Sequence, residues 1–254
     1  MGEPVVEDLR KIARENGYTF SIYKTKSILH GLSQVRDRTF YFFWKGEKVP
    51  QFGYIKREHE KIEDTIRSVK RDPSDPMNVL ANSNVPSADP YYRYVLEELE
   101  GGISHSQFQD KIDHSADVKH YIEDNGVTYD KVSQWMTKNG FDRQAERCMA
   151  MYHKLKNGGN IMRRGVNVPK GHIGAFVGHY PTMLTHPDED RFLTIRECLS
   201  IMKLPEDFVL QGGLKNINHI CQNVPVTTAQ DMAEEVFAYV NGRKDNQLVD
   251  TDFM

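Results

Sequence analysis

The amino-acid sequence predicts an α/β fold in which a small sheet is joined to a larger, mainly helical and irregular region. Near the N-terminus, a helical pattern precedes two runs rich in aromatic and β-branched residues, Tyr18 to Tyr23 and Thr39 to Trp44. From residue 91 onward, helical patterns alternate with stop signals, and residues 157–190 hold only brief β-type pieces. With 39% hydrophobic residues in 254, the chain can bury a core.

The N-terminal elements follow from local patterns. Apolar residues recur at helical spacing over residues 4–16, and the pair Asn16-Gly17 supplies a stop. The polar segment between the two β-type runs is expected to be a functional loop. Residues 56–70 predict a charged surface helix, whereas residues 71–90 are rich in Asp, Ser, Asn and Pro and predict a loop.

The remaining elements are predicted to be mainly helical. Over residues 91–156 the helical patterns end at three stop signals, Gly101-Gly102, Asn125-Gly126 and Asn139-Gly140. Residues 127–140 have a faint helix-turn-helix character, but core packing of Trp135 and Met136 is the favoured role. A short β-type piece is predicted at 172–177, followed by helices at 194–203, 214–222 and 226–241.

Composition excludes several classes of protein. The net charge of -3 does not by itself indicate a polyanionic partner, so any surface that binds nucleic acid must be a local basic patch. No apolar run approaches the ~20 residues of a membrane helix, and the N-terminus lacks a secretory signal pattern. Three widely spaced cysteines without CxxC argue against disulfides and a thiolate zinc site. We assign no metal, because no usual zinc spacing relates His105, His114 and His120.

The first segment with chemical character is HGLSQVRDRTFYFFW, residues 30–44. Gln34, Arg36 and Arg38 are two residues apart, so an extended backbone would point all three side chains to one face. An amide and two guanidiniums on one ridge suit phosphate oxygens or a carbonyl. The alternative is an exposed strand edge that charge keeps soluble.

The second segment is RFLTIRECLSIMKLPEDF, residues 191–208. Thr194 stands three residues before Glu197, which is the capping-box arrangement at the start of a helix. Taken alone, this segment is a well-made structural helix.

The third segment is HICQNVPVTTAQDMAEEV, residues 219–236. Pro225 fits the first turn of the helix behind it, and Gln222 and Asn223 could present amides to a neighbouring cleft. The structural alternative is plain capping of that helix.

In this order, with a variable region of about 140 residues after the first, the three segments resemble the eighth, ninth and tenth motifs of DNA (cytosine-5) methyltransferases. The eighth motif of that family usually reads G-V-P-Q-x-R-x-R, so Leu32 and Ser33 replace Val and Pro here. In the tenth, usually G-N-A/S-V-P, the first three residues are replaced by Cys221, Gln222 and Asn223.

The resemblance implies roles for the matching residues. Arg38 would reach the flipped target cytosine at its O2, and Arg36 would contact a backbone phosphate or brace the site, beside Gln34. The ninth-motif residues would brace the target-recognition region: Arg191, Thr194, Arg196 and Glu197. The tenth-motif residues would lie at the S-adenosylmethionine pocket: Gln222, Asn223 and Val224.

By position, the middle of the chain would be the target-recognition region that reads double-stranded DNA. Arg163 and Arg164 are the first candidates, because bidentate contact of arginine with guanine is the commonest specific base contact. Other polar residues of the irregular region could join them: Lys170, His172, His179 and Thr182. The alternative is that these arginines are simply solvated.

The residues that the family uses for catalysis do not occur in this sequence. No Cys follows Pro, and neither Glu-Asn-Val nor F-x-G-x-G is present. Met1 falls just after the place where Glu-Asn-Val would stand, which leaves a split enzyme, a fragment or a DNA-binding remnant. We expect a split enzyme that is inactive alone, whose partner chain carries the first six motifs and most of the S-adenosylmethionine site.

The expected fold class is therefore α/β, a partial Rossmann-like methyltransferase sheet completed by a partner, plus a mixed, largely helical and irregular target-recognition domain. Residues 1–55 would belong to the catalytic domain, 56–190 to the target-recognition domain, and 191–254 to helices that pack back on the catalytic domain. The alternative function is an inactive DNA-binding or decoy protein. The expected setting is the cytoplasm of a bacterial or phage-infected cell, within restriction-modification.

Overall fold

The computed structural model describes residues 4–243 and 247–249. The chain divides into two compact units. Unit 1 consists of the residues up to His59 together with those from Val224 on, and unit 2 is Glu60–Asn223.

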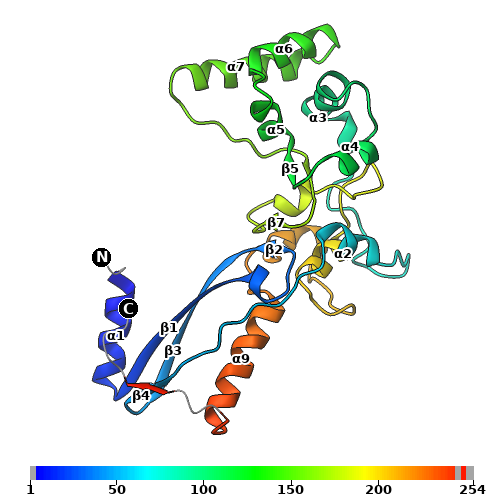
Figure 1. Cartoon of the computed structure of the whole chain (residues 1–254). Coiled ribbons are helices and arrows are strands. Elements are labelled where there is room, and N and C mark those ends of the chain that lie inside the picture. The colour runs from blue at the N-terminus through cyan, green and yellow to red at the C-terminus, as the bar shows by residue number, and fades with distance from the viewer. Residues whose placement is uncertain (1–3, 244–246, 250–254) are drawn as a thin grey trace. The chain divides into compact units, whose positions relative to one another are not determined.

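Unit 1 is built on an antiparallel hairpin of two long strands (Figure 1). Its strands β1 (Tyr18–Lys26) and β3 (Asp37–Lys45) pair from Tyr18↔Lys45 to Lys26↔Asp37. The other elements are α1 (Pro4–Glu15), a 3-10 turn (Ser27–Leu29), β2 (Gln34–Val35), β4 (Lys48–Pro50), α9 (Val226–Val240) and β8 (Gln247–Val249), with β4 antiparallel to β8. The predicted helix and both strands are confirmed, with longer strands than the patterns indicated.

The two faces of the hairpin differ in how well they are covered. Alternation along β3 puts Phe42 and Trp44 on one face, where the Trp44 ring meets Tyr239 of α9 at 5.1 Å between centroids. Tyr41 and Phe43 lie on the opposite face and stay exposed. The strands β1 and β3 pair antiparallel. A sheet in which parallel strands were added to this hairpin would therefore be mixed and not wholly parallel.

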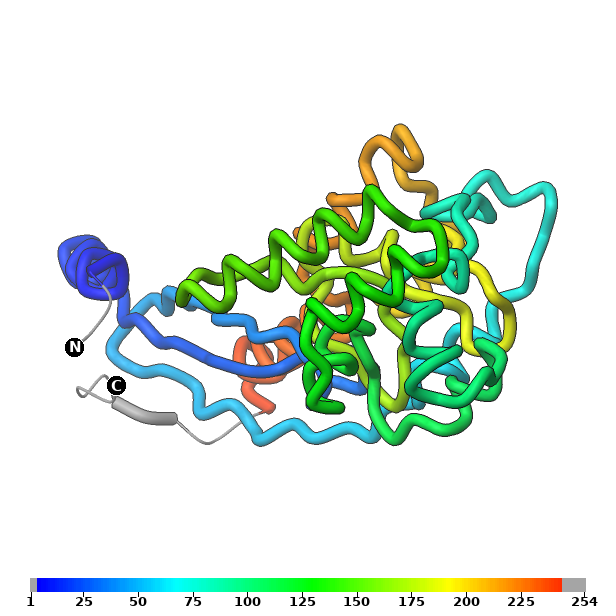
Figure 2. Tube along the Cα trace, turned by 90° about the horizontal axis from the view of Figure 1, so that it is seen from above, coloured from blue at the N-terminus to red at the C-terminus, as the bar shows by residue number. Residues whose placement is uncertain are grey.

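Unit 2 contains mostly short helices. They are α2 (Ile62–Ser68), α3 (Pro90–Tyr94) with a π-helical turn (Val95–Leu99), α4 (His105–Lys111), α5 (Val118–Asp124), α6 (Tyr129–Lys138), α7 (Asp142–Lys156) and α8 (Ile195–Ile201), with 3-10 turns at Pro86–Ala88, Tyr180–Met183 and Gly213–His219. The short strands are β5 (Ala116–Asp117), β6 (Asn167–Val168) and β7 (Ile173–Gly174), and β5 pairs antiparallel with β6. Helices α6 and α7 run side by side (Figure 2).

Two apolar cores stabilise unit 2. One lies among the helices α3 to α7 and contains Tyr92, Phe108 and Met136. The other joins α2 to α8 through Ile62, Ile66 and Leu199 among others. The core role predicted for Trp135 and Met136 is therefore confirmed. The division at residues 55/56 and 190/191 stays a prediction, although α8 packs on α2 within unit 2.

Two predicted helices differ from the structure. The helix expected over residues 56–70 begins only at Ile62, because Arg57 is held by long-range contacts, its N–H donating to the Leu29 carbonyl at 2.9 Å. The helix expected over 214–222 is a 3-10 turn. Helix α9 forms as predicted, but its apolar stripe is only partly covered, since Phe237 and Val240 are 58% and 70% exposed. Among the described residues, no helix has both the length and the apolarity to span a bilayer.

Candidate functional site

The loop between β1 and β3 is folded around the buried side chain of Ser27. The Ser27 hydroxyl accepts a hydrogen bond from the Arg36 N–H at 2.9 Å and donates one to the Gln34 carbonyl. Gly31 has φ +80°, and a Cβ there would lie 3.4 Å from the Glu58 carbonyl oxygen, so glycine suits both the conformation and the space. The loop is thus packed around its own polar groups.

The three polar residues predicted to form a ridge are not equally accessible. Gln34 is 0% and Arg36 7% exposed, which rules out the alternative of a solvated strand edge for these two. Arg38 is partly exposed, donates to the Asp37 carbonyl at 2.7 Å, and has its pKa lowered by partial burial. Of the three, Arg38 is the one placed to meet a ligand from solvent; its contact with a base stays a prediction.

A buried polar network, which sequence reasoning missed, ties this loop to α9. His30 Nδ1 lies 2.7 Å from Asp231 Oδ2, and its Nε2 lies 2.7 Å from the Thr25 hydroxyl. Because a carboxylate only accepts hydrogen bonds, Nδ1 must carry the proton. Arg57 donates to the same carboxylate, with Nε at 3.1 Å from Oδ2. No local pattern could indicate the pairing, since His30 and Asp231 are 201 residues apart.

The residues expected at a cofactor pocket lie on the surface just ahead of α9. Gln222, Asn223 and Val224 are all exposed, and Pro225 immediately precedes the helix. The sequence also lacks the glycine-rich F-x-G-x-G segment. These three residues therefore do not by themselves enclose an adenosyl group.

The start of α8 has the local structure that the sequence predicted. Thr194 and Glu197 form a reciprocal capping box, which is confirmed. Arg191 holds the same Glu197 carboxylate with two hydrogen bonds, of 2.9 and 2.8 Å. Arg196 in turn binds Asp75 at 2.6 and 2.9 Å, and this bond holds the pKa of Asp75 below its usual value. These contacts fix α8 inside unit 2.

His186, beside this pair, should make the stability of unit 2 depend on pH. Its Nδ1 accepts the N–H groups of Asp188 and Glu189, at 3.1 and 3.2 Å, and burial lowers its pKa from the ordinary 6.5, as does neighbouring Arg191. Below pH 6.5 the unfolded chain then binds a proton that the folded chain does not, so stability falls on acidification. Thermal melting from pH 7.5 to 5 should show this fall.

The matched variant is His186→Asn, because an asparagine Oδ1 can accept the same N–H groups and cannot be protonated in this range. The variant should show a shallower fall in melting temperature than the natural chain. Identical slopes for the two proteins would rule out His186 as the source.

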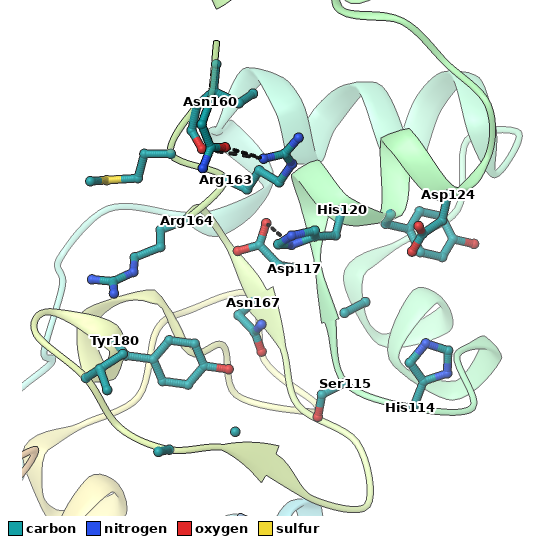
Figure 3. A pocket seen from close by; sticks show the side chains of 17 residues that line it. His114, Ser115, Asp117, His120, Asp124, Asn160, Arg163, Arg164, Asn167 and Tyr180 are labelled. Carbon is teal, nitrogen blue, oxygen red and sulfur yellow. Dashed lines mark hydrogen bonds and ion pairs between the residues drawn. The ribbon is translucent and has the colours of Figure 1, made fainter. Parts of the chain in front are cut away.

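Unit 2 contains a hollow of about 850 Å³ between the start of α5, the loop at 160–164 and the turn at 174–180 (Figure 3). Arg163 and Arg164 both line it, but they differ in their contacts. Arg163 Nε donates to both carboxylate oxygens of Glu123, at 3.0 and 2.7 Å, whereas the Arg164 guanidinium makes no such pair with a described residue and lies beside the turn at Gly178. Asp117, Asn167 and Tyr180 also line it, and sequence reasoning missed all three.

The other residues predicted to contact DNA lie outside the lining of this hollow. Lys170 Nζ donates to the Gln109 carbonyl at 3.0 Å, and the Thr182 hydroxyl to the His179 carbonyl at 2.7 Å. His172 and His179 are exposed. The structure therefore places Arg163 and Arg164 at the hollow, but not these four residues.

The histidines considered as metal ligands have other surroundings. Both ring nitrogens of His105 are used in the core, at 2.8 Å from the Tyr92 hydroxyl and 2.6 Å from the His186 carbonyl oxygen. His114 and His120 line the hollow. Within residues 4–243 and 247–249, no three His, Cys, Asp or Glu side chains are grouped to hold a metal ion.

Comparison with known proteins identifies the family. A curated protein of Methanocaldococcus jannaschii, named provisionally as a type II methyltransferase, is 42% identical over 52 residues. That alignment covers 20% of this chain and 17% of the relative, so it spans only a small part of the relative's length. The model of the C-5 cytosine-specific DNA methylases matches residues 4–238, and the chain therefore belongs to this family.

Proposed function

We propose that this chain is the DNA-recognition and active-site-completing half of a DNA cytosine-5 methyltransferase. C-5 cytosine DNA methylases act on DNA with S-adenosylmethionine as methyl donor. In the proposal, a complementary chain carries the first six motifs, the catalytic cysteine and most of the cofactor site. The complex acts at DNA in the cytoplasm, as in restriction-modification.

The chemistry of the cysteines is the observation that carries this proposal. Methylation at cytosine carbon 5 needs a thiolate that adds at carbon 6. Cys148, Cys198 and Cys221 are all buried, and burial raises the pKa of each thiol, for Cys148 and Cys221 to about 11. A reactive cysteine needs the opposite, an exposed and electropositive site that lowers the pKa. The proposal therefore places the nucleophile outside these 254 residues, on the complementary chain.

Unit 1 supports the assignment of a partner. Among the described strands, β1 and β3 pair only with each other, so each has an outer edge at which a further strand could pair. Large apolar side chains are exposed beside these edges and along α9: Tyr18, Tyr41, Phe43, Phe237 and Val240. Strands of the complementary chain would pair with an edge and cover these side chains, giving a mixed sheet.

Within the proposed complex, the motif resemblance assigns the remaining roles. Arg38 meets the target cytosine, Gln34 and Arg36 support it from the packed loop, and the Arg191–Glu197 segment braces the target-recognition part. The exposed residues 222–224 lie at the rim of a cofactor site that the partner completes. In this proposal residues 56–190 contact DNA.

An inactive DNA-binding protein is the second candidate, because it also needs no reactive cysteine. The exposed apolar side chains of unit 1 favour the subunit over this candidate. The presence or absence of a complementary chain distinguishes the two candidate functions. If a polypeptide with F-x-G-x-G and Pro-Cys co-purifies from the native host, the enzyme is favoured. If the chain binds DNA tightly and no such polypeptide accompanies it, the second candidate is favoured.

Reconstitution tests the proposed enzyme. The purified chain should transfer no radioactive methyl group from S-adenosylmethionine to DNA, and mixing with the complementary chain should start transfer. Arg38→Ala should lower the rate of the mixture by about 100-fold, the loss expected for one preorganised hydrogen-bond donor. Lys24→Ala, an exposed change on the neighbouring strand, is the matched control and should leave the rate unchanged.

Two results would contradict the proposal. Robust methylation by the chain alone would remove the need for a partner. Equal rates for Arg38→Ala and Lys24→Ala would remove Arg38 from the target pocket.

A further inference from the structure

Polar residues of the paired strands β5 and β6 line the hollow in unit 2. Asn167 lies on β6 opposite Asp117 of β5, and its carbonyl accepts the Thr185 N–H at 3.0 Å. Asn167 is only 6% exposed, yet its Oδ1 atom has no hydrogen-bond partner among the described residues. An amide oxygen that is buried and unpaired is costly unless a ligand or water supplies a donor. Asn167 is thus the first sign of a binding site.

Arg164 supplies the complementary donors. Neither a hydrogen bond nor an ion pair engages its guanidinium within the part of the chain that the structure describes. The backbone around it is fixed, because the Asp117 carboxylate accepts the Gly165 N–H at 3.0 Å and Lys119 Nζ donates to the Arg164 carbonyl at 3.3 Å. Arg163 is bound to Glu123, so Arg164 is the arginine of this pair that lines the hollow without an ion pair among the described residues. Its guanidinium lies beside Gly178 and interacts electrostatically with the Cys221 thiol.

Tyr180 completes the lining from the opposite side, with its hydroxyl directed toward Asn167 (Figure 3). The hollow therefore combines a planar fork of N–H donors, an amide oxygen that lacks a donor and an aromatic ring. A volume of about 850 Å³ lies within the range of sites that take whole ligand groups.

Guanine is the base that matches this set. Its O6 and N7 are adjacent acceptors that fit an arginine fork, whereas adenine offers only N7 beside an amino donor. The unpaired Asn167 oxygen needs an amino or ring N–H, which guanine itself or its paired cytosine provides. We propose that Arg164, Asn167 and Tyr180 form the guanine-reading site of this chain. This inference rests on the proposed function, because it takes DNA as the ligand.

The test uses the full chain and duplex DNA selected from a randomised pool. Each guanine of the selected sequence is replaced in turn by 7-deazaguanine, which lacks the N7 acceptor. At one position the replacement should weaken binding by about 10-fold or more for the natural chain, as expected for half of a bidentate contact. In Arg164→Lys, which keeps the charge but not the fork, that loss should vanish.

The matched control is Arg147→Lys on the exposed side of α7, which should keep the full loss caused by 7-deazaguanine. Thermal melting of each variant shows that it is folded. An abasic site opposite the sensitive guanine distinguishes two sources of the ligand: stronger binding indicates a guanine that enters unpaired, and weaker binding one read within the duplex.

The outcomes separate this inference from the proposed function. If the natural chain selects no sequence at all, both are overturned. If it selects a sequence but 7-deazaguanine affects the natural chain and Arg164→Lys equally, or if adenine is preferred at the Arg164-dependent position, only the guanine site is overturned.

Discussion

Replacing Asp231 with alanine should lower the free energy of unfolding of unit 1 by about 1–3 kcal/mol, the range found when the loss of one partner leaves a buried hydrogen-bond donor unsatisfied. Asp231 is 3% exposed, and its carboxylate accepts from His30 and from Arg57. Without it, the His30 Nδ1–H stays buried with no acceptor. The β1–β3 loop loses its attachment to α9, so Arg38 loses its support as well.

Urea unfolding followed by tryptophan fluorescence measures this change, because Trp44 packs against Tyr239 of α9. Glu234→Gln is the matched control. Glu234 is 58% exposed and lies 3.8 Å from the same Arg57, so its loss should cost less than about 1 kcal/mol. Hydrogen exchange should show faster exchange over residues 27–36 in Asp231→Ala alone. Equal stabilities for the two variants would contradict the structural role of the network.

Replacing Arg191 with methionine should lower the stability of unit 2 by about 3–5 kcal/mol, because it leaves a buried carboxylate without its cation. Glu197 is 2% exposed, and it keeps only the Thr194 N–H of the capping box and the neighbouring His186, 4.0 Å away. Methionine preserves much of the volume of arginine, so lost packing contributes little to the change.

Arg71→Gln is the control for Arg191→Met. Arg71 lies 3.2 Å from Glu189 with both side chains about half exposed, and such pairs contribute about 1 kcal/mol or less. Thermal unfolding of the two variants in the same buffer should therefore give clearly different midpoints. If Arg191→Met and the natural chain have the same midpoint of thermal unfolding, the Arg191–Glu197 pair does not stabilise α8.

Local signals explain why the sequence predicted many of the elements correctly. Gly126 and Gly140 have φ of +70° and +78°, the left-handed conformation that ends α5 and α6 and that glycine adopts without strain. The capping box at Thr194 involves residues three apart, so it was visible without any tertiary contact. The two aromatic strands were visible for the same reason, since their enrichment in aromatic and β-branched residues is local.

The candidate sites depended on contacts that no local pattern reveals. Ser27, Gln34 and Arg36 were visible as a polar segment, but their burial follows from how the loop folds around the Ser27 hydroxyl. Arg163 and Arg164 were indistinguishable as neighbours in sequence. Glu123, 40 residues from Arg163, makes one an anchor and leaves the other lining the hollow.

By itself, the amino-acid sequence determined most of the helices, the hairpin strands, the resemblance of three segments to family motifs and the absence of a Pro-Cys dipeptide, because each of these depends on residues a few positions apart. Only the tertiary structure decided which polar side chains are buried, which are paired and which remain available: the His30–Asp231 link, the inert cysteines and the Asn167–Arg164 hollow. The physical reason is that burial and pairing depend on neighbours brought together from 40 to 201 residues apart.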